Sequence, residues 1–134
     1  VKSETSSEEE IFVIVDGTRY GPYKHVWGIT FSKDGKHFAY AAADGSENQA
    51  WSYYMDGEPY ALKYDAVWPP KLSDDGTHIA WSARRGEGIV LALDGQEVYT
   101  GDKIFWGPKF DQYGNVAWIV KEGNTVVRLT FSSR

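Results

Sequence analysis

The feature that most constrains the fold is a threefold internal repeat with a period of about 40 residues. Five landmarks recur in the same order: an Asp-Gly pair, a Trp, an apolar residue four positions later, a Gly-containing turn, and an Ala followed by an aromatic residue. The Asp-Gly pairs begin at Asp16, Asp56 and Asp94, and the tryptophans are Trp27, Trp68 and Trp106. The apolar residues are Phe31, Leu72 and Phe110, and the turn glycines are Gly35, Gly76 and Gly114. The alanines before the aromatic residues are Ala39, Ala80 and Ala117. A fixed period of this length is typical of architectures that stack one supersecondary unit on the next.

Each unit is predicted to form short antiparallel strands. Runs of four to seven alternating or apolar residues are separated by Gly-containing turns, and no segment keeps a helical period. We expect first strands at 29–32, 70–73 and 108–111, second strands at 37–42, 78–83 and 115–120, third strands at 51–55, 89–93 and 125–131, and fourth strands at 58–64 and 96–100. The predicted fold class is therefore all-β, built from antiparallel four-stranded units of about 40 residues.

The chain divides into an acidic tail and a repeat domain. Residues 1–10 are polar, carry a net charge of −3 and lack an apolar period, whereas residues 11–134 contain the repeats and carry −2. We expect the first segment to be a flexible tail. The repeat domain lacks the basic stripe that neutralises a phosphate backbone, so a nucleic-acid partner is not expected.

Two further absences narrow the chemistry. The chain has no cysteine, which excludes disulfides and thiolate ligands. Its longest apolar run, Phe38–Ala43, is much shorter than the roughly 20 residues that a transmembrane helix needs. No membrane span is therefore expected.

Two segments of the repeat resemble a known family. ITFSKDGKHFAYAA (29–42) and PKLSDDGTHIAWSA (70–83) resemble the WD40-like repeat of PD40 type found in TolB-type β-propellers, and PKFDQYGNVAWIV (108–120) is a weaker match. The resemblance implies that each unit is a propeller blade, and it suggests a bacterial, periplasmic origin. It says little about function, because one fold hosts many functions.

The number of blades is unusual for that family. Closed propellers have four to eight blades, and this chain holds about three. Two copies could close one six-bladed ring as a homodimer, which is our preferred reading. The chain could instead be a fragment of a longer protein, or the strands could form another arrangement such as a sandwich.

The candidate binding residues precede the first strand of each unit. Trp27, Trp68 and Trp106 occupy equivalent positions beside Gly or Pro, where a propeller would present them at the mouth of its channel. Tryptophan can anchor a peptide or stack on a sugar ring, although these three could instead pack between blades. Lys71 and Lys109 alternate with apolar neighbours and would favour a carboxylate-bearing ligand, and His25 could donate a hydrogen bond to it.

Other residues with chemical potential have structural interpretations. His37 and His78 share one repeat position on different units, so a shared metal ion is not expected, and no zinc-ligand cluster is apparent. The Asp34-Gly35 and Asp75-Gly76 pairs suit hairpin turns rather than calcium loops. Trp81 and Trp118, within second strands, are predicted core residues, whereas Trp51 is ambiguous.

These observations predict a non-catalytic module that binds a protein or peptide through its Trp-containing segments and a central channel. No cofactor is expected, and no nucleophile, phosphate-loop or zinc-protease motif is present. Two alternatives stay open: a carbohydrate-binding, lectin-like oligomer, and the propeller part of a larger hydrolase. A glycosidase also remains open, because its two acids need not be close in sequence.

Overall fold

The computed structural model describes residues 10–43, 45 and 50–132, and within them it contains fourteen strands and no helix. Every strand pairing is antiparallel. The all-β, antiparallel prediction is thus confirmed. Nine of the ten residues of the predicted acidic tail lie outside the described residues, and so does most of the turn at 44–49.

The strands form four sheets, which we name I to IV in chain order. Sheet I contains β1 (Ile11–Val15) and β2 (Thr18–Tyr23). Sheet II contains β3 (His25–Phe31), β4 (Phe38–Ala43), β5 (Trp51–Met55) and β6 (Glu58–Pro59). Sheet III contains β7 (Ala66–Val67), β8 (Lys71–Leu72), β9 (Ile79–Arg85), β10 (Gly88–Leu93) and β11 (Gln96–Gly101), with β7 and β8 both paired to β9. Sheet IV contains β12 (Lys103–Phe110), β13 (Val116–Glu122) and β14 (Thr125–Phe131).

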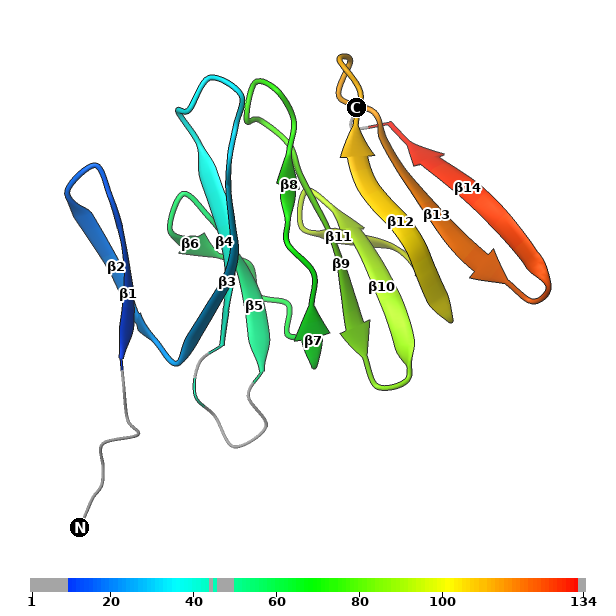
Figure 1. Cartoon of the computed structure of the whole chain (residues 1–134), viewed down its shortest axis with the longest axis horizontal. Helices are drawn as coiled ribbons and strands as arrows, with labels where there is room; N and C mark the ends of the chain where they lie inside the picture. Colours follow the sequence, from blue (N-terminus) through cyan, green and yellow to red (C-terminus); the bar gives the residue numbers. More distant parts are fainter. Residues whose placement is uncertain (1–9, 44, 46–49, 133–134) are drawn as a thin grey trace, which may run out of the picture.

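The four sheets follow one another in a row from the N-terminus to the C-terminus (Figure 1). A buried apolar cluster lies between each neighbouring pair of sheets. Alternate residues of one strand point into different clusters: Trp81 of β9 faces sheet II, whereas Ala80 faces sheet IV. Sheets I and IV do not pair with each other in the described part of the chain, so the row has two ends.

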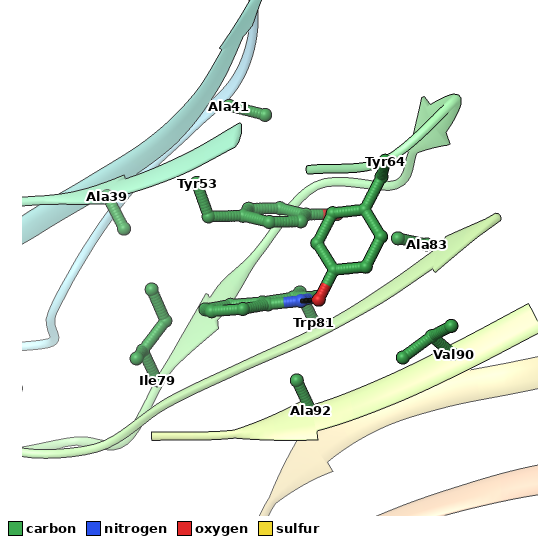
Figure 2. Close-up of a cluster of buried hydrophobic side chains, with 9 residues drawn as sticks. All are labelled: Ala39, Ala41, Tyr53, Tyr64, Ile79, Trp81, Ala83, Val90 and Ala92. Carbon is green, nitrogen blue, oxygen red and sulfur yellow. Dashed lines mark hydrogen bonds between the residues drawn. The ribbon is translucent and has the colours of Figure 1, made fainter. Parts of the chain in front are cut away.

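The cluster between sheets II and III centres on two stacked aromatic rings. The rings of Tyr53 and Trp81 lie 4.3 Å apart at 13°, and Tyr64 approaches them edge-on (Figure 2). The Trp81 indole N–H donates a hydrogen bond to the Tyr64 hydroxyl at 3.0 Å. The Tyr53 hydroxyl lies 2.7 Å from the carbonyl oxygen of Trp68 and 2.9 Å from that of Ser82, so it can donate to either. The buried polar groups are thereby paired, and they hold sheet II to sheet III.

The predicted Asp-Gly pairs form tight hairpin turns. Asp16, Asp56 and Asp94 adopt φ angles of 51°, 52° and 54°, and the glycine that follows each is also left-handed. Two successive left-handed residues define the type I′ turn, whose twist matches that of the flanking strands. Aspartate tolerates this conformation better than most side chains, which explains the repeated sequence.

The aspartate of this turn also holds the start of the second strand in the same sheet. In sheet II, the Asp56 carboxylate lies 2.8 Å from His37 Nδ1 and accepts a hydrogen bond from the Phe38 amide at 3.0 Å. The hydrogen bond to Asp56 raises the pKa of His37 above its ordinary value. We call this arrangement the aspartate clamp. Sheet III repeats it, with Asp94 bonded to His78 Nδ1 at 2.7 Å and to the Ile79 amide at 3.0 Å.

The Asp75 turn between β8 and β9 also has the hairpin role that was predicted for it. The Asp75 carboxylate accepts hydrogen bonds from the Thr77 amide and hydroxyl and from the Ser73 hydroxyl. These bonds lower the pKa of Asp75 to about 2. The carboxylate therefore satisfies local donors of its own turn.

Several strand boundaries differ from the prediction. The first strands of sheets II and IV begin earlier than expected, so Trp27 and Trp106 lie inside β3 and β12 rather than before them. Only Trp68 precedes its strand, β8, which is reduced to two residues. The fourth strand of sheet II ends at Pro59 instead of reaching Tyr64. Beyond Pro59 the chain bonds β5 only at separate points, through the Tyr60 amide and through the isolated bridge between Trp51 and Tyr64.

Candidate functional site

The first strands of sheets II, III and IV lie side by side along one edge of the row. β3 contacts β8, and β8 contacts β12, while each forms an edge of its own sheet. The approach is close at Gly28, where an added Cβ atom would lie 2.8 Å from the Pro69 Cα. A side chain at position 28 would push the strands apart. We call this the first-strand edge.

The three tryptophans of the repeat are exposed along this edge. Trp27, Trp68 and Trp106 expose 51%, 40% and 44% of their surface, whereas Trp81 and Trp118 are fully buried. The prediction that Trp81 and Trp118 are core residues is therefore confirmed. The tryptophans of the first-strand edge leave a large apolar surface in contact with solvent, where a ligand could cover it.

A cavity of about 440 Å³ lies between β8 and β12, and we call it cavity A. It brings together three of the predicted site residues: Trp106, Lys71 and Lys109. Its remaining lining residues are Leu72, Asp74, Gly107, Pro108 and Phe110. Both lysines are exposed, and two ammonium groups against one carboxylate leave the cavity with an excess positive charge. This combination suits a ligand with a carboxylate and an adjoining apolar group.

A second cavity, of about 360 Å³, lies between β3 and β7, and we call it cavity B. It contains His25 and Trp27, the two predicted site residues of sheet II, together with Trp51. The His25 and Trp51 rings are stacked, with centroids 6.0 Å apart and planes at 25°. Trp51, which the sequence left ambiguous, is therefore part of a candidate site. Trp68 lines neither cavity A nor cavity B, so the six predicted residues do not form one continuous site.

Sequence reasoning missed the contribution of β14 in sheet IV. The outward face of this sheet carries a groove of about 230 Å³ that shares Trp106 and Lys109 with cavity A and adds Arg128 of β14. Cross-strand pairing places further cations on the same face, because Lys103 pairs with Lys121 and Ile119 pairs with Arg128. The alternation of β14 could have indicated Arg128, but only once its pairing with β13 was known.

Two kinds of feature are absent from the described residues: a cluster of metal-ligating side chains and a membrane-spanning helix. Within residues 10–43, 45 and 50–132, no three His, Cys, Asp or Glu side chains cluster as a metal site would require. In that same part of the chain, no helix is long and apolar enough to cross a membrane.

Comparison with known proteins does not assign the chain to a family. No protein-family model matches the chain, and no curated protein matches it either. The resemblance of its repeats to the TolB type therefore stays a prediction, and the candidate site rests on the residues and cavities of this chain.

Proposed function

We propose that the chain is a non-catalytic binding module that holds an acidic peptide segment along the first-strand edge. In this proposal the four sheets are whole or partial blades of a TolB-like β-propeller, about three blades in all, and the first-strand edge faces its channel. The stacking of antiparallel meanders in chain order supports the blade interpretation. Cavity A would take a carboxylate-bearing side chain, while the exposed tryptophans contact apolar parts of the peptide.

The observation that carries this proposal is the convergence of Trp106, Lys71 and Lys109 on cavity A. These residues are separated by up to 38 positions and come from two sheets, so their meeting depends on the fold. Indole rings anchor peptides through large apolar contacts, and lysine pairs with carboxylates as a mobile point charge. The combination recognises charge and apolar surface together.

Binding suits these groups better than catalysis. A lysine becomes a nucleophile or base when burial removes its solvation, but Lys71 and Lys109 are both exposed. Asp74, the remaining charged residue of cavity A, is exposed as well. Solvated ammonium groups of this kind favour ion pairing with an incoming anion.

A decapeptide array with acidic, neutral and basic members tests the proposal. We expect the chain to select acidic peptides, and the selection to weaken as salt is raised. The double variant Lys71→Gln/Lys109→Gln should lose about tenfold in affinity, in line with one charge-assisted hydrogen bond. The matched control, Lys33→Gln/Lys36→Gln, removes the same charge from the exposed β3–β4 turn and should bind like the parent chain. Equal weakening in both variants would reduce the effect to net charge and contradict the proposal.

Cavity B favours a second candidate, a carbohydrate ligand. Trp27 is half exposed there, and its other lining residues are mostly apolar. An aromatic face of this kind can stack on the apolar face of a sugar. A glycan array separates the candidates: glycan binding lost in Trp27→Ala but kept in Lys71→Gln/Lys109→Gln would favour carbohydrate.

A further inference from the structure

Cavity A holds charges of both signs that do not pair with each other. Lys71, Lys109 and Asp74 all line it, and all three side chains are exposed. Among the described residues, no hydrogen bond or ion pair reaches any of these three charged groups. The chain does form ion pairs elsewhere, such as the one between Arg85 and Glu97 at 2.7 Å. The charged groups of cavity A are therefore available to a ligand.

Asp74 is not required by the turn in which it lies. The residue at the same position of the β3–β4 turn is Lys33, and that of the β12–β13 turn is Gln112. In the β8–β9 turn, the carboxylate that accepts the local hydrogen bonds belongs to the neighbouring residue, Asp75. The hydrogen bonding of the turn thus gives no structural reason for an aspartate at position 74.

Asp74 also lies where further negative charge gathers. A smaller cavity of about 160 Å³ shares Asp74 with cavity A and is lined by Asp75 and Asp111 as well. Both of these carboxylates accept hydrogen bonds from their own turns. His78 lines the same cavity, but its ring is bonded to Asp94. Among the described carboxylates of this cavity, only Asp74 is left to bind a cation from a ligand.

We propose that Asp74 determines the specificity of cavity A, by binding a basic side chain that lies close to the acidic residue of the bound peptide. This inference rests on the function proposed above and adds a second charge to the ligand. The two lysines bind the carboxylate of the peptide, and the Asp74 carboxylate accepts hydrogen bonds from its ammonium or guanidinium group. Because Asp74 repels a segment with acidic charge alone, it also acts against such ligands.

The positions of the charged groups define the spacing in the peptide. Lys71 and Asp74 are three positions apart, and an extended chain rises about 3.3 Å per residue, so their backbones are separated by roughly 10 Å at most. In an extended peptide, side chains two positions apart point to the same face and are separated by about 7 Å. The long stem of a lysine or arginine spans the remaining distance. The expected ligand therefore has its acidic and basic residues two positions apart.

The size and walls of cavity A suit such a segment. Its volume of about 440 Å³ is larger than a single carboxylate needs and falls in the range of roughly 300–1,000 Å³ that is usual for ligand pockets. Trp106, Leu72 and Phe110 supply apolar walls between the charged groups. The methylene stem of a basic side chain can pack on walls of this kind while its charged end stays solvated.

Three labelled peptides with acetyl and amide caps test the inference, since the caps remove the terminal charges. They are Ala-Phe-Glu-Ala-Lys-Ala and two analogues, in which glutamine replaces either the lysine or the glutamate. By fluorescence anisotropy, the parent chain should bind the doubly charged peptide about three- to fivefold more tightly than the analogue without lysine, as expected for one exposed ion pair. In Asp74→Asn this preference should disappear. The matched control, Glu87→Gln, removes one exposed carboxylate at the opposite end of β9 and should keep the preference.

The analogue without lysine gives a second result of opposite sign. Because Asp74 repels its carboxylate, Asp74→Asn should bind this analogue as tightly as the parent chain does, or more tightly. Equal binding of the two glutamate-containing peptides by the parent chain would overturn the inference and leave the proposed function intact. A preference for lysine that persists in Asp74→Asn would do the same. If neither of these peptides binds better than the peptide without glutamate, the proposed function fails, and this inference fails with it.

Discussion

Strands β4 and β13 occupy the same place in their sheets, but their surroundings differ. All six residues of β4 are buried, because sheet I covers one face and sheet III covers the other. In β13, Val116, Trp118 and Val120 are buried against sheet III, whereas the residues between them face the open side of sheet IV. The burial of a repeat strand is thus set by its neighbours as much as by its own sequence.

The amino acids at equivalent positions follow this difference. Ala41 of β4 is fully buried, whereas its counterpart in β13, Ile119, is half-buried and belongs to a face that also carries Lys121. A covered face needs small side chains so that two sheets can approach, while an open face accepts larger and charged ones. Four predictions test how far this contrast governs stability.

The largest effect is expected where the two faces differ most. Ala41→Lys places an ammonium group in the cluster between sheets II and III, and should lower the free energy of unfolding by more than about 4 kcal/mol. Ile119→Lys adds the same group to the open face and should cost less than about 1 kcal/mol. Urea unfolding followed by circular dichroism measures both. Similar losses would mean that the two faces are equally covered in solution, as in a closed assembly.

The next effect concerns the hydroxyl that joins sheets II and III. Tyr53→Phe keeps the ring stacked on Trp81 but removes the donor that lies near two carbonyl oxygens. Because buried acceptors lose their partner, we expect a loss of about 1–3 kcal/mol in unfolding free energy. Tyr113→Phe is the matched control, since Tyr113 is 76% exposed and its loss should stay within about 0.5 kcal/mol.

The aspartate clamp can be compared with Asp16, which closes the same type of turn in sheet I but bonds no second strand among the described residues. Asp94→Asn should lower the unfolding free energy by about 1 kcal/mol, because the bonds to His78 and to the Ile79 amide weaken. Asp16→Asn should have almost no effect, since the Asp16 carboxylate holds no second strand among the described residues. Equal losses in the two variants would show that the turn itself, and not the clamp, is what the aspartate stabilises.

The smallest effect is a dependence of stability on pH. His37 has a pKa above its ordinary value of 6.5 because of its hydrogen bond to Asp56, so the folded state binds the proton more tightly than the unfolded state. The stabilisation is complete below about pH 6.5 and is lost as the pH rises through the higher pKa of the folded state. Titration of the His37 ring by NMR should show the raised pKa, and Asp56→Asn should return it towards 6.5. An unchanged pKa in that variant would remove Asp56 as the cause.

The sequence predicted the parts of the fold that depend on local chemistry. The apolar runs and the Gly-containing turns between them located the third strands Trp51–Met55 and Thr125–Phe131 correctly. The lengths of β3 and β12 were predicted less well, since a bulge lets each strand continue through its Trp-Gly segment. Such irregular pairing depends on the partner strand, and a single strand does not encode it.

The sequence predicted several residues of the candidate site, but not which of them lie together in the structure. The repeat identified Trp106, Lys71 and Lys109, and the structure brings them together in cavity A. It does not bring His25 and Trp27 to the same place, because consecutive sheets are spaced along the row. The clamp partners Asp56 and Asp94 were read only as turn residues. Their bonds to His37 and His78 depend on how the third strand pairs with the second.

The aspartate clamp has a consequence for how such a chain can grow. Each clamp joins strands of one sheet, and the residues that form it fall within about 20 positions of one another. Inserting or deleting one whole repeat would therefore leave the clamps of the other repeats intact, since none connects different sheets. The contacts between sheets would only need a new neighbour of the same shape. A chain built in this way can change its length by duplication in steps of a single repeat, without redesign of the sheets that it already has.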